Sequence, residues 1–315
     1  MNNTNITITS QSNLQIHRYV AIFGIPACFV GLILNTSIAY LLLTDKYFKK
    51  STYRLILASV LSDVLSSTAA FIGYLLIAIG NVSYHLGTIL CKIILYITLM
   101  SFGISIMNLS LISVHRYFIV ARSLSSFYRK YKIQFLIACE LFLHVASILT
   151  SSPILVYASA HPNSSTLCDI SNIIHNLAIW EFMFTLIMYI IPVSIMITIY
   201  IKLAAIYRNH VRPGYTTPNR AETEIMQKKR FTKVLMSITF STVLISWPHF
   251  ACLIGTAVTR KTIYQISLES NILYALVYIA ISITISIFVV NPFILLKFDH
   301  NVRQKLISLL QKYLC

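Results

Sequence analysis

The sequence predicts an all-α membrane protein, a bundle of seven transmembrane helices. Hydrophobic residues make up 57% of its 315 residues and charged residues only 11%, whereas a soluble domain has about 25% charged residues. The hydrophobic residues gather in seven long runs, each able to cross a hydrocarbon core about 30 Å thick. Backbone groups inside lipid must be hydrogen-bonded internally, and none of the runs shows the alternation of a barrel strand, so we expect helices.

Three regions follow in order along the chain. Residues 1–18 are polar and lack both the basic start and the apolar core of a signal peptide, so they are expected to form an extracellular N-terminus. Residues 19–296 are expected to form the bundle. Its seven apolar runs span 19–43, 53–79, 89–120, 133–157, 174–205, 231–258 and 270–296.

The last region, 297–315, predicts a short amphipathic helix and tail on the cytoplasmic side. Between Asp299 and Leu314, apolar residues recur at helical spacing with basic residues between them, a pattern typical of a helix that lies on a membrane surface.

The positions of the positive charges predict the orientation. Most of the 25 Lys and Arg residues fall in the loops after the first, third and fifth runs or in the C-terminal tail. Because cytoplasmic loops are enriched in Lys and Arg, the N-terminus is expected outside. The same residues are expected to attract anionic inner-leaflet lipid rather than nucleic acid. The other side holds only Arg18, Lys92, Arg260 and Lys261.

Glycosylation triplets provide an independent check of this orientation. Four triplets lie on the predicted outer side and begin at Asn2, Asn5, Asn81 and Asn163. Two further triplets, at Asn35 and Asn108, lie inside apolar runs and are expected to carry no sugar.

Two cysteines fall on the oxidising outer side, Cys91 at the start of the third run and Cys168 after the fourth. They are predicted to form a disulfide, with two free thiols as the alternative. Cys315 is predicted as a palmitoylation site, with an unmodified thiol as the alternative. No Cys/His cluster has metal-binding spacing, so no metal site is expected.

An ionisable residue inside a membrane span predicts a functional site. Asp63 lies in the middle of the second run, with Ser105 and Asn291 at a similar predicted depth. Three oxygen-bearing side chains could hold a small cation such as an allosteric Na⁺, or a proton and water. The alternative is a purely structural hydrogen-bond cluster. No other cofactor is expected.

Every run but the fourth contains a short motif, and the motifs follow one another in a fixed order. They are Gly31 with Asn35, Asp63, Cys91 with Arg116, His115-Arg116-Tyr117, Pro192 with Tyr200, Ser246-Trp247-Pro248, and Asn291-Pro292-Phe293-Ile294-Leu295. Together they make the chain resemble the rhodopsin-like (class A) G-protein-coupled receptors over nearly its whole length. The resemblance implies a multi-pass plasma-membrane receptor that binds an extracellular ligand and activates a heterotrimeric G protein.

Several positions depart from the family pattern. His115 replaces the acid that restrains the motif arginine, and Lys228 stands where a second acid is expected on the sixth helix. Thr242 replaces a phenylalanine, Leu295 replaces a tyrosine, and Trp247 lies one position nearer to the proline than usual. We therefore expect raised basal activity. By resemblance, the activation switch comprises Ile106, Pro192, Trp247, Pro248 and Pro292.

The resemblance also restricts the ligand. Thr98 replaces the aspartate that amine receptors require, and Ile285 replaces the lysine that binds retinal, so neither a biogenic amine nor retinal is expected. A peptide, a lipid and a small odorant-like molecule remain open. The alternative for each pocket residue is that it merely packs helices. The predicted pocket comprises Thr98, Leu99, Phe102, His249, Phe250, Leu253 and Tyr278.

Coupling to a G protein is expected at the cytoplasmic ends of the third and fifth helices. Arg116 can donate up to five hydrogen bonds to a partner's backbone, and His115, Tyr117, Leu124 and Tyr200 accompany it. An enzyme is not expected, because no nucleophile–base pair is visible. Two alternatives remain: a receptor-like partner or decoy that does not signal, and a transporter or channel, although no inverted repeat supports the latter.

Overall fold

The computed structural model describes residues 2–120, 126–161, 164–170, 172–209 and 220–314. Side chains are described for 15–120, 130–161, 165–170, 172–206, 232–309 and 311.

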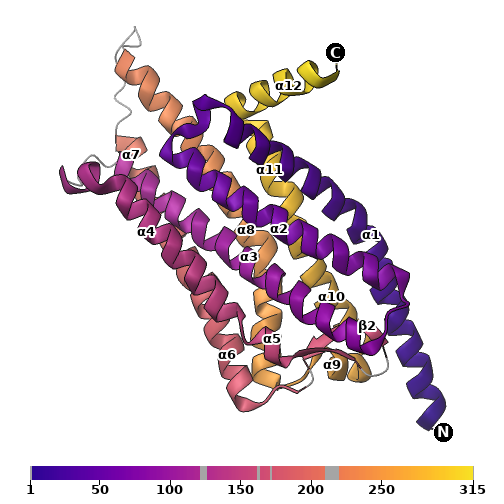
Figure 1. The fold of residues 1–315 in the computed structure, drawn as a ribbon. Coiled ribbons are helices and arrows are strands. Elements are labelled where there is room, and N and C mark those ends of the chain that lie inside the picture. Colours follow the sequence, from indigo (N-terminus) through magenta and orange to yellow (C-terminus); the bar gives the residue numbers. More distant parts are fainter. Residues whose placement is uncertain (1, 121–125, 162–163, 171, 210–219, 315) are drawn as a thin grey trace.

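Long helices dominate this part of the chain (Figure 1). The first four spans comprise α1 (Asn2–Thr44), α2 (Ser51–Ile79), α3 (Tyr84–Val120), and α4 (Ser126–Ser151) continued by the single turn α5 (Ile154–Tyr157). The last three comprise α6 (His175–Thr185) joined through the π-helix η2 (Leu186–Ile190) to α7 (Ile191–Asn209), then α8 (Arg220–Thr259), and finally α10 (Asn271–Ile285) with α11 (Ile287–Phe298). Connecting elements are η1 (Lys46–Lys49), β1 (Ala158–His161), β2 (Ser164–Ile170), α9 (Ile263–Glu269) and α12 (His300–Leu314).

The predicted seven-helix bundle is confirmed for the described residues. Seven helical segments are long and apolar enough to cross a membrane, and each matches one predicted run to within a few residues. Several helices begin before their predicted runs, most of all α1 at Asn2 rather than residue 19, α8 at Arg220 rather than residue 231, α4 at Ser126 rather than residue 133, and α3 at Tyr84 rather than residue 89.

Span α3 forms the centre of the bundle. It packs against α2, α4, α7, α8 and the two strands, and every residue from Ser101 to Ser113 is buried. Span α4 instead faces outward, with Leu141 65% and Phe142 68% exposed. Large apolar side chains on that surface suit contact with lipid, which is as apolar as they are.

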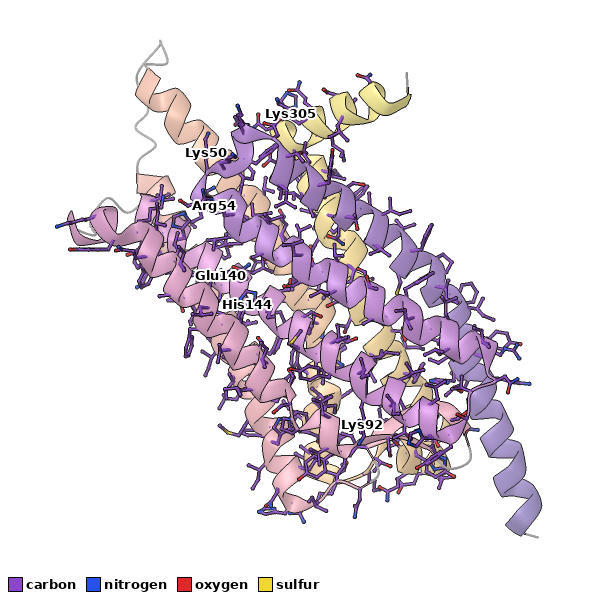
Figure 2. The ribbon with its side chains drawn as sticks, in the orientation of Figure 1. Lys50, Arg54, Lys92, Glu140, His144 and Lys305 are labelled. Carbon is purple, nitrogen blue, oxygen red and sulfur yellow. A yellow bond between two sulfur atoms is a disulfide. The ribbon has the colours of Figure 1, made fainter. Side chains whose placement is uncertain are left out.

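The bundle has two distinct ends (Figure 1). The N-terminus and the antiparallel β1–β2 hairpin lie at one, here named the hairpin end. Helix α12 lies at the other, the α12 end. Lys50, Arg54 and Lys305 lie at the α12 end and Lys92 at the hairpin end (Figure 2), in line with the predicted charge asymmetry.

The predicted helix after the seventh span is present as α12. Its start is shifted by one residue because Asp299 caps it, accepting hydrogen bonds from the backbone N–H groups of Asn301 and Val302. Tyr53 Oη donates to the other Asp299 oxygen at 3.0 Å, and Lys305 Nζ lies 3.0 Å from Asp45 Oδ2. These contacts fasten α12 to the first loop and the start of α2.

The hairpin, which the sequence did not predict, closes over the bundle at Gly87 of α3. A Cβ atom at this position would overlap the carbonyl oxygen of Ser165 in β2. Glycine is therefore required for the close approach of strand and helix.

We expect Gly87→Ala to destabilise the hairpin end by about 1–3 kcal/mol, the usual cost of an overpacked site. Thermal unfolding of the purified protein measures this. Gly255→Ala is the matched control, because a Cβ there meets no atom within 4 Å. Equal melting temperatures for Gly87→Ala and wild type would contradict the packing.

Candidate functional site

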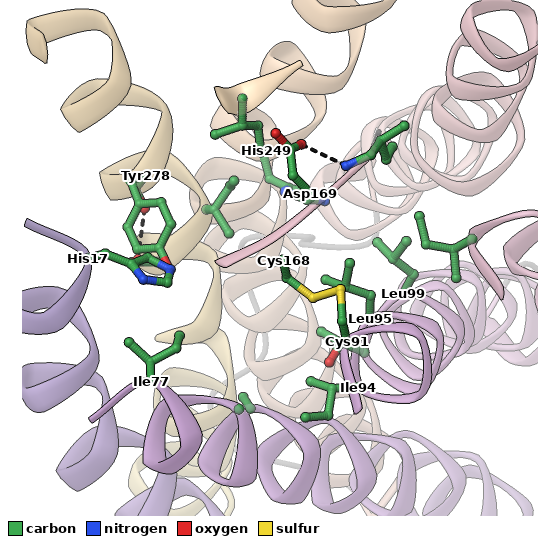
Figure 3. A pocket seen from close by; sticks show the side chains of 18 of the residues that line it. His17, Ile77, Cys91, Ile94, Leu95, Leu99, Cys168, Asp169, His249 and Tyr278 are labelled. Atoms are coloured by element: carbon green, nitrogen blue, oxygen red, sulfur yellow. Dashed lines mark hydrogen bonds between the residues drawn. A yellow bond between two sulfur atoms is a disulfide. The ribbon is translucent and has the colours of Figure 1, made fainter. Parts of the chain in front are cut away.

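A cavity of about 290 Å³ opens among the spans at the hairpin end (Figure 3). Its walls are mostly apolar, with a few polar groups, as in most ligand sites. Six of the predicted pocket residues line it: Thr98, Leu99, Phe102, His249, Leu253 and Tyr278.

The prediction that Phe250 lines this cavity is wrong. Its side chain is buried behind the wall, 1% exposed, and stacks on Tyr189 and Phe102 with ring centroids 4.3 and 5.9 Å apart. Successive helical residues are rotated by about 100°, so His249 faces the cavity while its neighbour packs between spans.

The predicted disulfide between Cys91 and Cys168 is confirmed, with the two Cα atoms 5.5 Å apart. It joins the first turns of α3 to β2, directly beside the cavity (Figure 3). The hairpin is thereby held over the opening of the bundle.

Asp169, the residue after the bridged cysteine, is a second fastening of the hairpin. Its carboxylate accepts hydrogen bonds from the backbone N–H groups of Tyr264 and Ile170, both at 2.7 Å. Burial raises the pKa of Asp169 above its ordinary value, against the lowering effect of these hydrogen bonds. The contact holds α9 against β2 and closes one side of the cavity.

Two further polar residues line the cavity and were not predicted as site residues. Glu181 of α6 is 1% exposed, and Thr256 Oγ1 lies 3.2 Å from its Oε2. His17 of α1 is 2% exposed, and its ring lies 4.6 Å from that of Tyr278 (Figure 3). Glu181 could have been predicted from the sequence, because it is the single acidic residue in the fifth run. His17 lies outside the predicted runs, and nothing in the sequence marks it as a site residue.

The predicted polar core is assembled deeper in the bundle. Asp63, Ser105 and Asn291 line one small cavity of about 30 Å³, together with Asn35. Asp63 is 3% exposed, and its Oδ1 accepts no hydrogen bond from the described residues. Thr242 donates to Asn291 Oδ1 at 3.1 Å. An unsatisfied buried carboxylate oxygen beside a hydroxyl and an amide fits a small hard cation, which prefers oxygen ligands.

Four of the predicted coupling residues belong to the described part of the chain and lie toward the α12 end: His115, Arg116, Tyr117 and Tyr200. His115 is completely buried in α3, and Arg116 is close enough to Tyr200 for their side chains to interact electrostatically. Tyr200 Oη shares a 3.1 Å hydrogen bond with Thr239 of α8. Tyr117 lies beneath Lys202, with Nζ 5.9 Å from the ring centroid. The structure thus joins α3, α7 and α8 at this end.

The predicted switch residues fall into two groups. Ile106 is buried in the core at 1% exposure, and Pro248 and Pro292 lie inside continuous helices; Pro192 follows the π-helix in the fifth span. Trp247, however, is 53% exposed and faces out of the bundle, so the structure does not place it with the buried switch residue Ile106. Its shift by one position relative to the proline turns it outward.

The predicted glycosylation, lipidation and remaining coupling positions lie mostly outside the described side chains. Asn81 lies exposed in the loop between α2 and α3. Asn2 and Asn5 belong to α1, but their side chains are outside the described residues, as is the side chain of Lys228. Asn163, Leu124 and Cys315 lie wholly outside the described residues.

Two ionisable residues of α4, Glu140 and His144, are four residues apart and so lie one helical turn from each other (Figure 2). This spacing would allow their side chains to pair. His144 Nδ1 hydrogen-bonds the backbone oxygen of Glu140 at 2.8 Å rather than its carboxylate.

A comparison with protein families finds one match that covers most of the chain. The model of the seven-transmembrane receptors of the rhodopsin family matches residues 34–295. No curated protein matches the sequence.

Proposed function

Because the chain belongs to the rhodopsin family of seven-transmembrane receptors, we propose that it binds a ligand in the cavity at its hairpin end and activates a heterotrimeric G protein at its α12 end. Members of this family are receptors and not enzymes, and they are multi-pass proteins of the plasma membrane. In general they couple an extracellular ligand to a G protein. Membership also sets aside the transporter or channel alternative.

One observation carries the proposal: the cavity and the coupling residue Arg116 lie at opposite ends of the same central helix, α3. Span α3 contributes Thr98, Leu99 and Phe102 to the cavity and Arg116 to the opposite end. A ligand that favours one arrangement of α3 against α7 and α8 would thereby change the environment of Arg116. Such a ligand shifts the balance only by its difference in affinity for the two arrangements.

In this proposal the hairpin end is extracellular, and the basic α12 end faces the cytoplasm and its anionic lipid. Two observations support this orientation: the disulfide lies at the hairpin end, and Lys50, Arg54 and Lys305 lie at the other end (Figure 2). The ligand is neither a biogenic amine bound through α3 nor retinal, because Thr98 and Ile285 lack the required groups.

A panel of G-protein subtypes tests the proposal in transfected cells without added ligand. Wild type is expected to exceed Arg116→Ala for at least one subtype at matched surface expression, because Arg116 is the proposed contact. Equal signals for every subtype would instead support the receptor-like partner or decoy that does not signal.

We also propose that Asp63, Ser105 and Asn291 hold Na⁺ and favour the inactive state. Sodium is expected to raise the melting temperature of wild type above that in the same concentration of choline chloride. Asp63→Asn should abolish this difference, because it removes the only charged ligand of the proposed site. Lowered basal signalling in sodium is the second readout. An unchanged sodium effect in Asp63→Asn would place the ion elsewhere.

A further inference from the structure

Acidic groups give the cavity at the hairpin end a distinct ligand preference. From the lining residues we infer that the ligand carries a protonated nitrogen on an apolar body, and that this nitrogen binds Glu181. The inference rests on the proposed receptor function and specifies the chemistry of its ligand.

Glu181 is a buried carboxylate with few hydrogen-bond donors. Among the described residues, only Thr256 Oγ1 donates to it, at 3.2 Å. That hydroxyl has one hydrogen and also lies 2.9 Å from the backbone oxygen of Leu253. A carboxylate can accept about four hydrogen bonds, so Glu181 retains unused capacity where it lines the cavity.

No described cation balances this carboxylate. The residues that line the cavity include Asp169 and Glu181 but neither Lys nor Arg. Two cations near the hairpin end are engaged elsewhere: Arg260 contacts His175 at 3.1 Å, and Lys261 contacts Glu269 at 2.7 Å. A buried charge is costly unless it is paired. A cationic ligand would supply the partner, whereas a carboxylate or phosphate ligand would be repelled.

Asp169 and Glu181 have different roles. The Asp169 carboxylate is occupied by backbone N–H groups of β2 and the neighbouring α9 segment, so it fastens the hairpin. Glu181 has no such backbone partner among the described residues and remains available to a ligand. We therefore assign the cation contact to Glu181 alone.

A second, independent observation that points to a ligand is a buried nitrogen atom of His17, on the α1 side of the cavity. His17 is 2% exposed and lines the cavity, and its Nδ1 has no hydrogen-bond partner in the described part of the chain. Buried polar atoms are normally hydrogen-bonded. With Tyr278 beside it (Figure 3), this atom offers a polar contact to a second group of the ligand.

Between these polar positions the walls are apolar, formed by residues such as Leu95, Leu99 and Ile281. They would bind the apolar body of the ligand, whose burial is favourable. Two sources share this chemistry. One is a lipophilic amine that binds through Glu181 of α6 and not through the α3 position at which biogenic amines bind, where this chain has Thr98. The other is a short peptide with a basic side chain.

Matched probes separate the effect of the ligand's charge from that of its shape. Two arms distinguish the lipophilic amine from the basic peptide. The small-molecule arm uses 4-phenylbutylamine, 4-phenylbutanol and 4-phenylbutanoate. The peptide arm uses acetyl-Phe-Leu-Arg-amide and its neutral citrulline analogue. Binding is measured as the rise in melting temperature of the full-length receptor in lipid nanodiscs, which follows from mass action and needs no G protein. Failure here therefore remains distinguishable from failure of the proposed coupling.

In at least one arm, wild type is expected to bind the cation at least tenfold more tightly than its neutral or anionic counterpart. Glu181→Gln should abolish this preference with little change in shape, and Glu181→Asp should retain part of it. Glu269→Gln, a carboxylate outside the cavity, is the matched control and should behave as wild type. No preference for the cation in either arm, or an unchanged preference in Glu181→Gln, would overturn the inference.

Discussion

Cys91→Ala is expected to remove most of the receptor from the cell surface and to lower the melting temperature of the fraction that remains. The disulfide to Cys168 closes a loop with a sequence separation of 77 residues. Loss of a native disulfide commonly costs about 2–5 kcal/mol, a large part of the stability of a typical domain. Surface labelling of intact cells and thermal unfolding measure the two effects.

The arrangement around the bridge strengthens this expectation. Cys168 is followed by Asp169, which holds α9, and β2 packs against Gly87 of α3. Freeing Cys168 therefore loosens both the hairpin and the wall of the cavity. Cys168→Ala should match Cys91→Ala, and the double variant should lose no more than either alone. Cys139→Ala, at a free cysteine of α4, is the control; an equal loss in this variant would contradict a specific role for the bridge.

His115→Asp is expected to lower basal G-protein signalling about tenfold or more. His115 is completely buried beside Arg116 and near Lys132, and it supplies no negative charge. A carboxylate about 4 Å from a cation gains on the order of 4 kcal/mol at an effective dielectric of about 20, before desolvation. A net gain of only ~1.4 kcal/mol changes the active-to-inactive ratio about tenfold.

The matched control for this prediction is His115→Asn, which removes the imidazole ring without adding charge. It should signal as wild type, or more strongly, whereas Arg116→Ala should not signal. All variants are compared at equal surface expression in a ligand-free assay. Equal basal signals for wild type and His115→Asp would mean that helix packing, rather than the missing acid, sets the resting state.

Features that depend on composition and coarse position were predictable from the sequence. The seven spans follow from apolar length, and the Cys91–Cys168 bridge follows from sidedness, because neither depends on the direction of a single side chain. The cluster of Asp63, Ser105 and Asn291 also met as expected, since polar groups inside a membrane have few alternatives to one another.

The predictions that failed depend on the direction in which a single side chain points from its helix, which changes by about 100° from one residue to the next. Phe250 was expected to line the cavity and instead packs behind its wall, and Trp247, expected to belong to the activation switch, faces out of the bundle. No charged residue lies between Lys233 and Arg260, so charge could not distinguish the inward from the outward face of this helix. Glu181 was visible as a lone acid, but its meeting with Thr256 of another span depends on tertiary packing. The hairpin likewise has strands too short to show a clear alternation.

G-protein activation is tested most directly by nucleotide exchange on purified heterotrimeric G proteins of each subtype, with the receptor in lipid nanodiscs and no ligand present. Wild type is expected to accelerate exchange on at least one subtype, Arg116→Ala is not, and His115→Asp is expected to fall between them or near the latter. Exchange at the receptor-free rate for every subtype, with a receptor shown to be folded by its melting transition, would contradict activation of G proteins by this receptor.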